Sequence, residues 1–338
     1  MINHIYQLIA AGTVSIKYED ISFGDKVIVR PEYMALCHAD QRYFSGQRDA
    51  ETMKKKLPMA LIHECCGRVV YDPMGNLSVG QKVVLIPNTP PENYEGEIYE
   101  NYVEGATFRS SGYDGFMQEL VSTRADRVVP FQNIEPTIAA ITEFVSVCVH
   151  ACRRFDAIAH SGRERVGIWG DGSLAFTVAN VLKSMFPEIK IAVIGMQRQK
   201  LAQFSFVDET YISNEIPADF KIDHAFECCG GSGSFYAIED VIKYIRPQGT
   251  LMLMGVSEHQ VPINTRMVLE KGMTLVGSSR SGRVDFEAAV KLLENKALQH
   301  RLKAIVFEER PVKNIDGIYR VFQSDLATPF KTVFKWEV

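Results

Sequence analysis

The chain has 338 residues, of which 46% are hydrophobic and 23% are charged, and its formal net charge is −4 at pH 7. This length suffices for two domains with their own cores, and the composition is that of a globular protein. The acidic balance excludes the basic surface typical of nucleic-acid binding or of a polybasic membrane patch. No apolar run approaches the ~18 residues that span a bilayer, and residues 1–10 lack the layout of a signal peptide, so we expect a cytoplasmic protein.

The seven cysteines, an odd number that includes two adjacent pairs, do not form the pattern of a disulfide framework. We expect most of them to be reduced, buried small residues. Cys37 is the exception, because other metal-ligating residue types occur near it in the sequence.

The first 130 residues alternate short apolar runs with glycine and proline, which predicts a β-rich domain. The expected strands are Tyr6–Ile9, Ser15–Tyr18, Val27–Arg30, Arg68–Tyr71, Lys82–Ile86, Phe116–Val121 and Arg127–Pro130. Cys37–Ser45 is expected to be a loop or a short helix. Pro87–Gly115 is a long irregular segment, and a loop of that length is usually functional or packed as a lobe. Pro136–Phe155 then has the apolar spacing of a helix.

A glycine turn follows within Arg165–Ala175 (RVGIWGDGSLA). An apolar run leads into Gly170–Ala175, apolar residues then recur at helical spacing as far as Pro187, and Ile189–Gly195 completes a strand–helix–strand unit. In this context the G-x-G-x-x-A pattern predicts dinucleotide binding, because the glycines let a pyrophosphate approach the backbone and the helix N-terminus offers free N–H groups. The alternative is an ordinary glycine turn in an α/β domain.

Three later apolar runs are expected to extend a parallel sheet: His224–Cys228, Thr250–Met254 and Thr274–Ser278, with a helix from about Ser234 to Ile245. A helix near Phe286–Leu293 and an alternating segment, Lys331–Val338, follow. The fold class is therefore α/β, with a β-rich domain and an inserted domain built on a doubly wound parallel sheet. We predict the first domain over residues 1–147, to which residues 284–338 return, and the dinucleotide-binding domain over residues 148–283.

The end of the second strand of this unit indicates which nicotinamide cofactor fits. NAD-binding units carry an acidic residue there, about 20 residues after the glycines, whereas this strand ends at Gly195 and is followed by Arg198 and Lys200. Two cations would pair with the 2′-phosphate that a carboxylate would repel. The sequence therefore favours NADP(H), and the alternative is that both cations only begin a solvated helix.

Cys37, Asp40, His63, Glu64 and Glu143 carry the thiolate, imidazole and carboxylate groups that a four-coordinate zinc ion accepts. Each also has a simpler explanation, as a core cysteine, a turn histidine or a surface charge, and sequence alone does not bring them together. His63 and Glu64 are the most informative pair, because they follow an apolar run and precede a strand, where a charged pair needs a partner.

Several motifs occur in one recognisable order: Cys37-His38-Ala39-Asp40, Ile62-His63-Glu64-Cys65-Cys66-Gly67, Asp114-Gly115-Phe116, Gly170–Ala175 and Phe226-Glu227-Cys228-Cys229-Gly230. With them the chain resembles the zinc-dependent medium-chain dehydrogenases/reductases along nearly its whole length. It is most similar to the ribulose-5-phosphate reductase branch, on Met1-Ile2-Asn3, Ala39–Tyr43, Phe108–Gly112 and Gly277–Gly282. The resemblance implies a GroES-like catalytic domain, a Rossmann domain, and zinc-dependent reduction of D-ribulose 5-phosphate to D-ribitol 5-phosphate by NADPH, feeding CDP-ribitol for teichoic acid or capsule.

The resemblance also implies roles for individual residues. Cys37, His63 and Glu143 would ligate one catalytic zinc, and Glu64 would enter the metal shell when water leaves. Asp40 would accept the other N–H of His63 and fix its tautomer. The expected cofactor contacts are Gly170, Gly172, Ser173, Leu174, Arg198, Lys200, Cys229, Gly255 and Ser278.

The chain departs from the family pattern at three places. Ala39 replaces the Ser or Thr that usually relays a proton, so the proton route stays open between bound water, Glu64 and His38. Residues 88–112 contain no cysteine, so we expect no structural zinc. Ile62 precedes His63 where glycine is usual.

The substrate phosphate needs a local cation, and we expect it from Arg109 with Ser110, or from Arg42; Tyr43 and Arg280 are further candidates. Each of these could instead be a surface residue or part of an internal ion pair. The expected partners are a sugar phosphate, a second copy of the chain in a dimer or tetramer, and a cytidylyltransferase that uses the product. The alternatives are an NAD-dependent polyol dehydrogenase, similar to sorbitol dehydrogenase, and a nucleotide-binding protein without catalysis.

Overall fold

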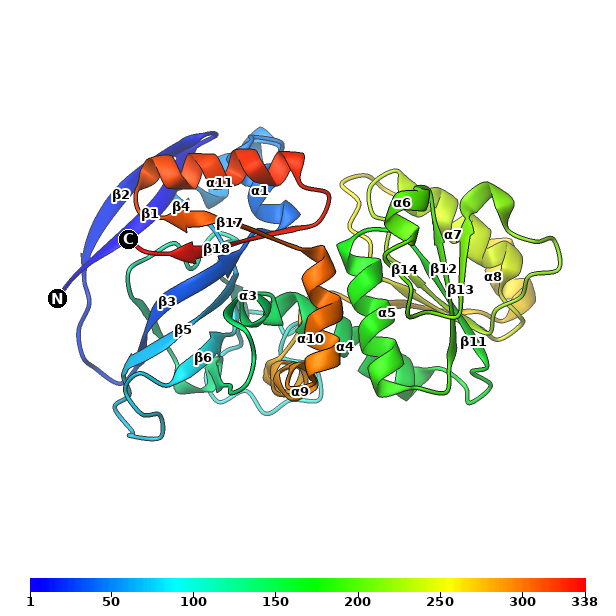
Figure 1. Ribbon diagram of the computed structural model, residues 1–338, viewed down its shortest axis with the longest axis horizontal. Helices are drawn as coiled ribbons and strands as arrows, with labels where there is room; N and C mark the ends of the chain where they lie inside the picture. The colour runs from blue at the N-terminus through cyan, green and yellow to red at the C-terminus, as the bar shows by residue number, and fades with distance from the viewer. The chain divides into compact units, whose positions relative to one another are not determined.

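The computed structural model describes residues 1–338 and divides the chain into two compact units (Figure 1). Unit 1 consists of Met1–Ser146 and Arg280–Val338, and unit 2 consists of Val147–Ser279. The C-terminal segment therefore belongs to the unit that the N-terminal residues build. No helix of the structure has the length and apolar character needed to cross a membrane.

Unit 1 is built on a seven-stranded, mostly antiparallel sheet in the order β10-β6-β5-β3-β18-β17, with β9 also paired to β3. Its strands are β3 (Val27–Ala35), β5 (Glu64–Tyr71), β6 (Lys82–Leu85), β9 (Val121–Thr123), β10 (Val128–Pro130), β17 (Val306–Val312) and β18 (Lys331–Trp336). Apolar side chains of this sheet, such as Trp336 of β18, form one core with Tyr43 of α1 and Phe116 of the loop before β9. β18 lies inside the sheet, so a strand near the C-terminus completes the core.

Smaller elements surround that sheet. A three-stranded sheet has the order β2-β1-β4, with β1 (Ile2–Ala10), β2 (Thr13–Asp20) and β4 (Met59–Ala60), and β7 (Asn88–Thr89) pairs with β8 (Thr107–Phe108). The helices are α1 (His38–Phe44), α2 (Ala50–Lys56), α3 (Pro136–Ala140), α9 (Arg283–Leu293), α10 (Lys296–Leu302) and α11 (Ile315–Ala327). Short 3₁₀ turns cover Ala125–Arg127 and Lys303–Ile305. Figure 1 shows α11 lying along β17 and β18, with which it packs.

Unit 2 is a six-stranded sheet in which every pair is parallel, in the order β13-β12-β11-β14-β15-β16. The strands are β11 (Arg165–Trp169), β12 (Lys190–Gly195), β13 (Glu209–Ile212), β14 (His224–Glu227), β15 (Thr250–Leu253) and β16 (Thr274–Gly277). The helices are α5 (Ser173–Met185), α6 (Arg198–Leu201), α7 (Gly233–Tyr244) and α8 (Thr265–Lys271), with a 3₁₀ turn at Ser213–Glu215; α4 (Thr142–Ile158) begins before Val147. In chain order this is the 3-2-1-4-5-6 arrangement of a Rossmann sheet, which binds dinucleotides where the order reverses, beside β11 and β14.

Most of the predicted elements occur, and the predicted fold class is confirmed. The strand expected over Phe116–Val121 is wrong, because only Val121–Thr123 is a strand. Phe116 and Met117 instead donate to the Ile62 and Leu61 carbonyls, and the Glu119 N–H donates to the His4 carbonyl. The helix expected over Pro136–Phe155 is broken at Ile141 into α3 and α4. Helix α11 was not predicted from the sequence, although its buried residues Ile318, Val321 and Phe322 have helical spacing.

Candidate metal and cofactor sites

Three metal-ligating side chains converge in unit 1. The ligand atoms of Cys37, His63 and Glu64 all lie within 4.8 Å of one another. Cys37 caps the N-terminus of α1, directly after β3, and Glu64 begins β5. Because β3 and β5 pair antiparallel with Ala35 opposite Glu64, the ends of the two strands bring residues 27 positions apart to one place.

The carboxylate of Asp40 connects the segments that carry these residues. It is fully buried; Oδ1 accepts hydrogen bonds from the Ile62 N–H (3.0 Å) and the Ser110 hydroxyl (2.5 Å), and Oδ2 accepts one from the Cys37 N–H (3.3 Å). Oδ2 also lies 3.4 Å from His63 Nδ1. Burial by itself would raise the pKa of Asp40, but the charge of His63 and these hydrogen bonds hold that pKa below its ordinary value.

Glu64 has a cationic partner on one oxygen only. The buried Lys331 ammonium, at the start of β18, donates to Glu64 Oε1 and to the Leu36 carbonyl (2.7 Å). Glu64 Oε2 is buried and has no hydrogen-bond partner. Burial raises the pKa of Glu64 to about 7 despite the lysine, with the charge of Glu143 adding to the increase.

This donor set fits a zinc ion. A buried carboxylate oxygen without a donor costs free energy unless a cation compensates it, and Glu64 Oε2 is such an atom beside a thiol and an imidazole. Thiolate, imidazole and carboxylate are ligands of catalytic zinc sites, which keep a position open for water or substrate. Lys331 was missed from the sequence, where the only signal was a lysine at the start of a strand whose other residues include Val333, Phe334 and Trp336.

Glu143, the third predicted ligand, lies in the first turn of α4 and is buried. It interacts electrostatically with His63, Lys331 and Asp40, so it belongs to the same neighbourhood, outside the trio of atoms that lie within 4.8 Å. Burial raises the pKa of Glu143.

Three non-glycine residues around this cluster have left-handed backbone angles: Ile62 (φ 72°), Ser110 (φ 61°) and Arg280 (φ 57°). Ile62 is the most unusual, because β-branched residues strongly disfavour this region. Its carbonyl accepts a hydrogen bond from the Phe116 N–H (2.7 Å), and a Cβ on Gly115 would lie only 2.4 Å from that oxygen. The Asp114-Gly115-Phe116 motif thus packs directly on the bend that carries His63.

The residues predicted for the substrate phosphate have different surroundings. The Arg109 guanidinium donates to the carbonyls of Asp114 (3.1 Å) and Ser122 (2.8 Å), and burial lowers the pKa of Arg109 to about 10. The Ser110 hydroxyl donates to Asp40. Arg42 lies in the last turn of α1 and is partly buried.

Arg280 is exposed, and it is connected to the metal-ligating residue His63 through the ring of Phe108. Its guanidinium carbon is 4.7 Å from the centroid of the Phe108 ring. That ring is 5.4 Å from the His63 ring, centroid to centroid. The charge of Arg280 also acts on Glu143, whose pKa it lowers slightly against the effect of burial.

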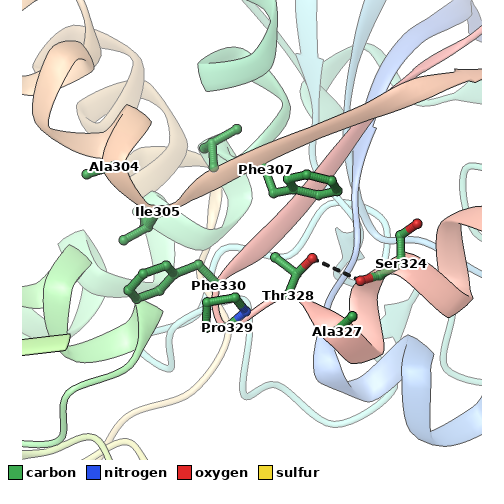
Figure 2. Close-up of a pocket in the computed structure, with 9 residues that line it drawn as sticks. Ala304, Ile305, Phe307, Ser324, Ala327, Thr328, Pro329 and Phe330 are labelled. Carbon is green, nitrogen blue, oxygen red and sulfur yellow. Dashed lines mark hydrogen bonds between the residues drawn. The ribbon is translucent and has the colours of Figure 1, made fainter. Parts of the chain in front are cut away.

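A pocket of about 400 Å³ borders the same region of unit 1 (Figure 2). Figure 2 shows its lining side chains, none of which is ionisable: Ala304, Ile305, Val306, Phe307, Ser324, Ala327, Thr328, Pro329 and Phe330. The Thr328 hydroxyl donates to the Ser324 carbonyl (2.9 Å) at its wall. Phe330, which lines the pocket, directly precedes Lys331 in the chain.

The glycine turn of unit 2 has the geometry of a phosphate cradle. Gly170 has φ 137°, donates to the Ile194 carbonyl (2.8 Å), and a Cβ there would lie 3.0 Å from the Cys228 carbonyl oxygen. Gly172 caps α5 without a side-chain hydrogen bond, and a Cβ there would meet nothing within 4 Å. Ser173 and Leu174 form the first turn of α5, so their N–H groups are among those that an anion would meet.

The loop after β12 carries the cations predicted for the 2′-phosphate. Arg198 and Lys200 lie on α6, and Arg198 forms an exposed ion pair with Glu215 (2.5 Å). The Asp171 carboxylate accepts hydrogen bonds from the N–H groups of Met196 and Gln197, at 2.8 Å each. The glycine turn and the loop after β12 are therefore joined directly.

Glu227 fixes two further loops at the same edge of the sheet and was not assigned a role from the sequence. Its buried carboxylate accepts hydrogen bonds from Cys229 N (2.9 Å), Gly230 N (3.1 Å), Gly255 N (2.9 Å) and the Ser234 hydroxyl (2.9 Å). Cys229 and Gly255 were both predicted to contact the cofactor. Ser278, the third such residue, follows β16, and its buried hydroxyl oxygen has no hydrogen-bond partner.

Comparisons with known proteins match both units. The family "Alcohol dehydrogenase GroES-like domain" matches residues 24–133, and "Zinc-binding dehydrogenase" matches residues 207–295. The chain is 56% identical to a ribulose-5-phosphate reductase of Streptococcus pneumoniae, over 100% of this chain and 98% of that protein. It is 47% identical to a ribulose-5-phosphate reductase of Bacillus spizizenii, over 100% of both. The structure is similar to that of Staphylococcus aureus TarJ in complex with NADPH, with a TM-score of 0.89 and 43% identity over the full length of both chains.

Proposed function

Because the chain belongs to the zinc-dependent medium-chain dehydrogenases, and within them to the ribulose-5-phosphate reductases, we propose that it reduces D-ribulose 5-phosphate to D-ribitol 5-phosphate with NADPH. The observation that carries the proposal is the buried group of Cys37, His63 and Glu64, in a chain that is similar along its whole length to reductases of this name. The reaction adds a hydride to the C2 carbonyl and a proton to its oxygen, and it yields NADP⁺.

Cys37, His63 and Glu64 would hold the zinc ion, with Glu143 beside them. Zinc at this position supplies a Lewis acid that polarises the ketose carbonyl. Asp40, whose Oδ2 lies 3.4 Å from His63 Nδ1, would hold the imidazole so that its other nitrogen could bind the metal. Lys331 binds Glu64 Oε1, so Oε2 is the oxygen left for the cation. Ala39 provides no hydroxyl, so the proton comes from another group.

NADPH would bind at the carboxyl edge of the unit 2 sheet, where it supplies the hydride. The pyrophosphate would meet the N–H groups at Gly172–Leu174. No carboxylate extends from Gly195 to repel a 2′-phosphate, and Arg198 and Lys200 would pair with it. Exposed ion pairs such as that of Arg198 with Glu215 contribute little to stability. Arg198 can therefore leave Glu215 and bind the 2′-phosphate at little cost in free energy.

The substrate phosphate would be recognised by Arg280. Arg109 and Ser110 are engaged inside unit 1, whereas the exposed Arg280 lies against Phe108, which contacts His63. We expect Arg280→Asn, a residue that tolerates positive φ, to raise KM for the phosphorylated ketose about tenfold or more through loss of a charge-assisted contact. Arg266→Ala, which removes an exposed cation on α8, is the control. An unchanged KM in the Arg280 variant would remove this residue from the phosphate site.

The function is tested by NADPH consumption with D-ribulose 5-phosphate, beside D-ribulose and NADH, before and after chelation. We expect fast, chelator-sensitive oxidation only with NADPH and the phosphorylated ketose, and loss of reduction in Cys37→Ser. Equal turnover of D-ribulose with NADH would instead identify a polyol dehydrogenase.

We also propose that the enzyme forms a dimer or tetramer, acts beside a cytidylyltransferase that consumes D-ribitol 5-phosphate, and works in the cytoplasm. The cellular location is supported by the seven cysteines, none of which forms a disulfide in the structure. Light scattering of the purified chain, alone and with the transferase, tests the first two statements.

A further inference from the structure

We propose that Ser110 is a positioning residue for the metal ligand His63, and that it acts through Asp40. The inference rests on the zinc site of the proposed function, and it assigns to Ser110 a role different from the phosphate contact expected from the sequence. Ser110 belongs to the segment 87–115, called here the lobe. The proposal therefore makes the lobe part of the machinery that holds the metal.

The first argument is how the hydrogen bonds divide over the Asp40 carboxylate. Oδ1 is held by the Ser110 hydroxyl at 2.5 Å and the Ile62 N–H at 3.0 Å, whereas Oδ2 faces His63 Nδ1 and the Cys37 N–H. The last torsion of an aspartate side chain is broad and does not fix the carboxylate plane by itself. The two donors on Oδ1 therefore act with the Cys37 N–H on Oδ2 to fix the carboxylate plane, and Oδ2 is the atom that faces the imidazole.

The second argument is that the backbone is strained where this hydroxyl turns inward. Ser110 has φ 61°, a value that costs a non-glycine residue free energy. Its own N–H donates to the Tyr113 carbonyl (2.9 Å), which closes a tight turn. In this turn the hydroxyl of the next residue, Ser111, points elsewhere and accepts a hydrogen bond from Lys56 (2.9 Å). The two adjacent serines thus contact different parts of unit 1: Ser110 contacts Asp40 beside the metal-ligating residues, and Ser111 contacts α2.

The third argument is burial. Ser110 and Asp40 are both buried, so water does not replace a lost donor on Oδ1. Removal of the hydroxyl leaves a buried, charged oxygen with a single donor. The carboxylate is then free to rotate toward other donors, and His63 loses its fixed orientation.

The experiment measures metal binding in Ser110→Ala, Ser110→Gly and the matched control Ser111→Ala. Zinc affinity is obtained by competition with a chromophoric chelator, and ligand geometry from the visible absorption of the cobalt(II)-substituted chain. Loss of an outer partner of a ligating histidine typically weakens metal binding about 10- to 100-fold, and we expect about tenfold for Ser110 because it acts through Asp40. Both Ser110 variants should also shift the cobalt spectrum, and Ser111→Ala should match the unmodified chain in both measurements.

The glycine variant keeps the test decisive if Ser110→Ala folds poorly, because glycine accepts the positive φ without strain. Unchanged zinc affinity and an unchanged cobalt spectrum in Ser110→Gly would overturn the proposal, as would equal losses in Ser111→Ala. The readout uses the metal alone. If the unmodified chain binds zinc but does not reduce D-ribulose 5-phosphate, the proposed function fails while the inference is still decided by the variants.

Discussion

Ile62 is the residue at which the local backbone conflicts most clearly with the side chain. It is fully buried, β-branched and in the left-handed region, immediately before His63. The family usually has glycine there, and the positive φ gives the physical reason for that preference. Ile62 thus combines a favourable buried side chain with an unfavourable backbone conformation.

This combination predicts that, at position 62, the glycine variant is more stable than the alanine variant, which is the reverse of the usual order. Both Ile62→Ala and Ile62→Gly lose the buried side chain, at about 2–5 kcal/mol. Only glycine also removes the left-handed strain, so we expect Ile62→Gly to be about 1 kcal/mol more stable than Ile62→Ala. Urea unfolding measures both. Val69, a buried residue of β5, is the control: Val69→Ala should be more stable to urea than Val69→Gly. The usual order at both positions would show that Ile62 is unstrained.

His224 gives unit 2 a predictable response to acid. Burial and then the charge of His160 lower the pKa of His224 to about 4 from 6.5. Between these pH values the unfolded chain binds a proton at this imidazole and the folded chain does not, so the free energy of unfolding falls as the pH is lowered. The neutral His224 makes its full contribution to the free energy of unfolding above pH 6.5. About 3 kcal/mol of that contribution is lost when the pH falls to 4.

His224→Asn tests this response, because an asparagine oxygen replaces Nδ1, which accepts a hydrogen bond from the Thr250 N–H (3.0 Å). The variant should lose less stability than the unmodified chain between pH 6.5 and 4.5 in urea titrations. The control is His259→Asn, at an exposed position, which should follow the unmodified chain. Parallel curves for all three proteins would contradict the assignment.

At the scale of elements, the turn from β12 into α6 determines the choice of cofactor. Arg198 and Lys200 lie on a helix of only four residues, fixed to the glycine turn through Asp171. We expect the double variant Arg198→Ala, Lys200→Ala to raise KM for NADPH about tenfold or more, since each charge-assisted contact contributes about 1.5–3 kcal/mol. KM for NADH should hardly change. Lys190→Ala, which removes an exposed cation at the other end of β12, is the control, and an equal loss with NADH would argue against 2′-phosphate recognition.

Elements with local signals could be predicted from the sequence, whereas contacts between distant segments could not. The strand–helix–strand pattern around Gly170 predicts its element correctly because the apolar period, the glycines and Pro187 are all local signals. The contacts of Glu64 are different: its partner Lys331 lies 267 residues away and reaches it only because β18 enters the sheet beside β3. Ser110 and Arg109 are similar cases, since an adjacent hydroxyl and guanidinium suit a phosphate in sequence, and only the turn shows that both point inward.

At the scale of the whole molecule, the predicted metal ligands belong to unit 1 and the predicted cofactor residues to unit 2. Chelation should therefore abolish ketose reduction and leave NADPH affinity within about twofold, because no predicted cofactor residue is also a predicted metal ligand. Fluorescence titration with NADPH, before and after zinc removal, measures this. Loss of NADPH binding on chelation would show that the two sites depend on each other.

The position of Lys331 in the chain also has a consequence for the order of events during synthesis. Residues 147–279 of unit 2 are contiguous and precede β18 in the chain, so that sheet can be complete before β18 is made. Unit 1 cannot finish until β18 leaves the ribosome, and Lys331 follows Glu64 by 267 residues, roughly 15 to 50 seconds at elongation rates of about 5–20 residues per second. For that interval Cys37, His63 and Glu64 are present without the ammonium that later holds Glu64. The nascent chain therefore offers these groups to metal ions in a loose form, and the arrangement of the folded unit 1 arises only after β18 has been made.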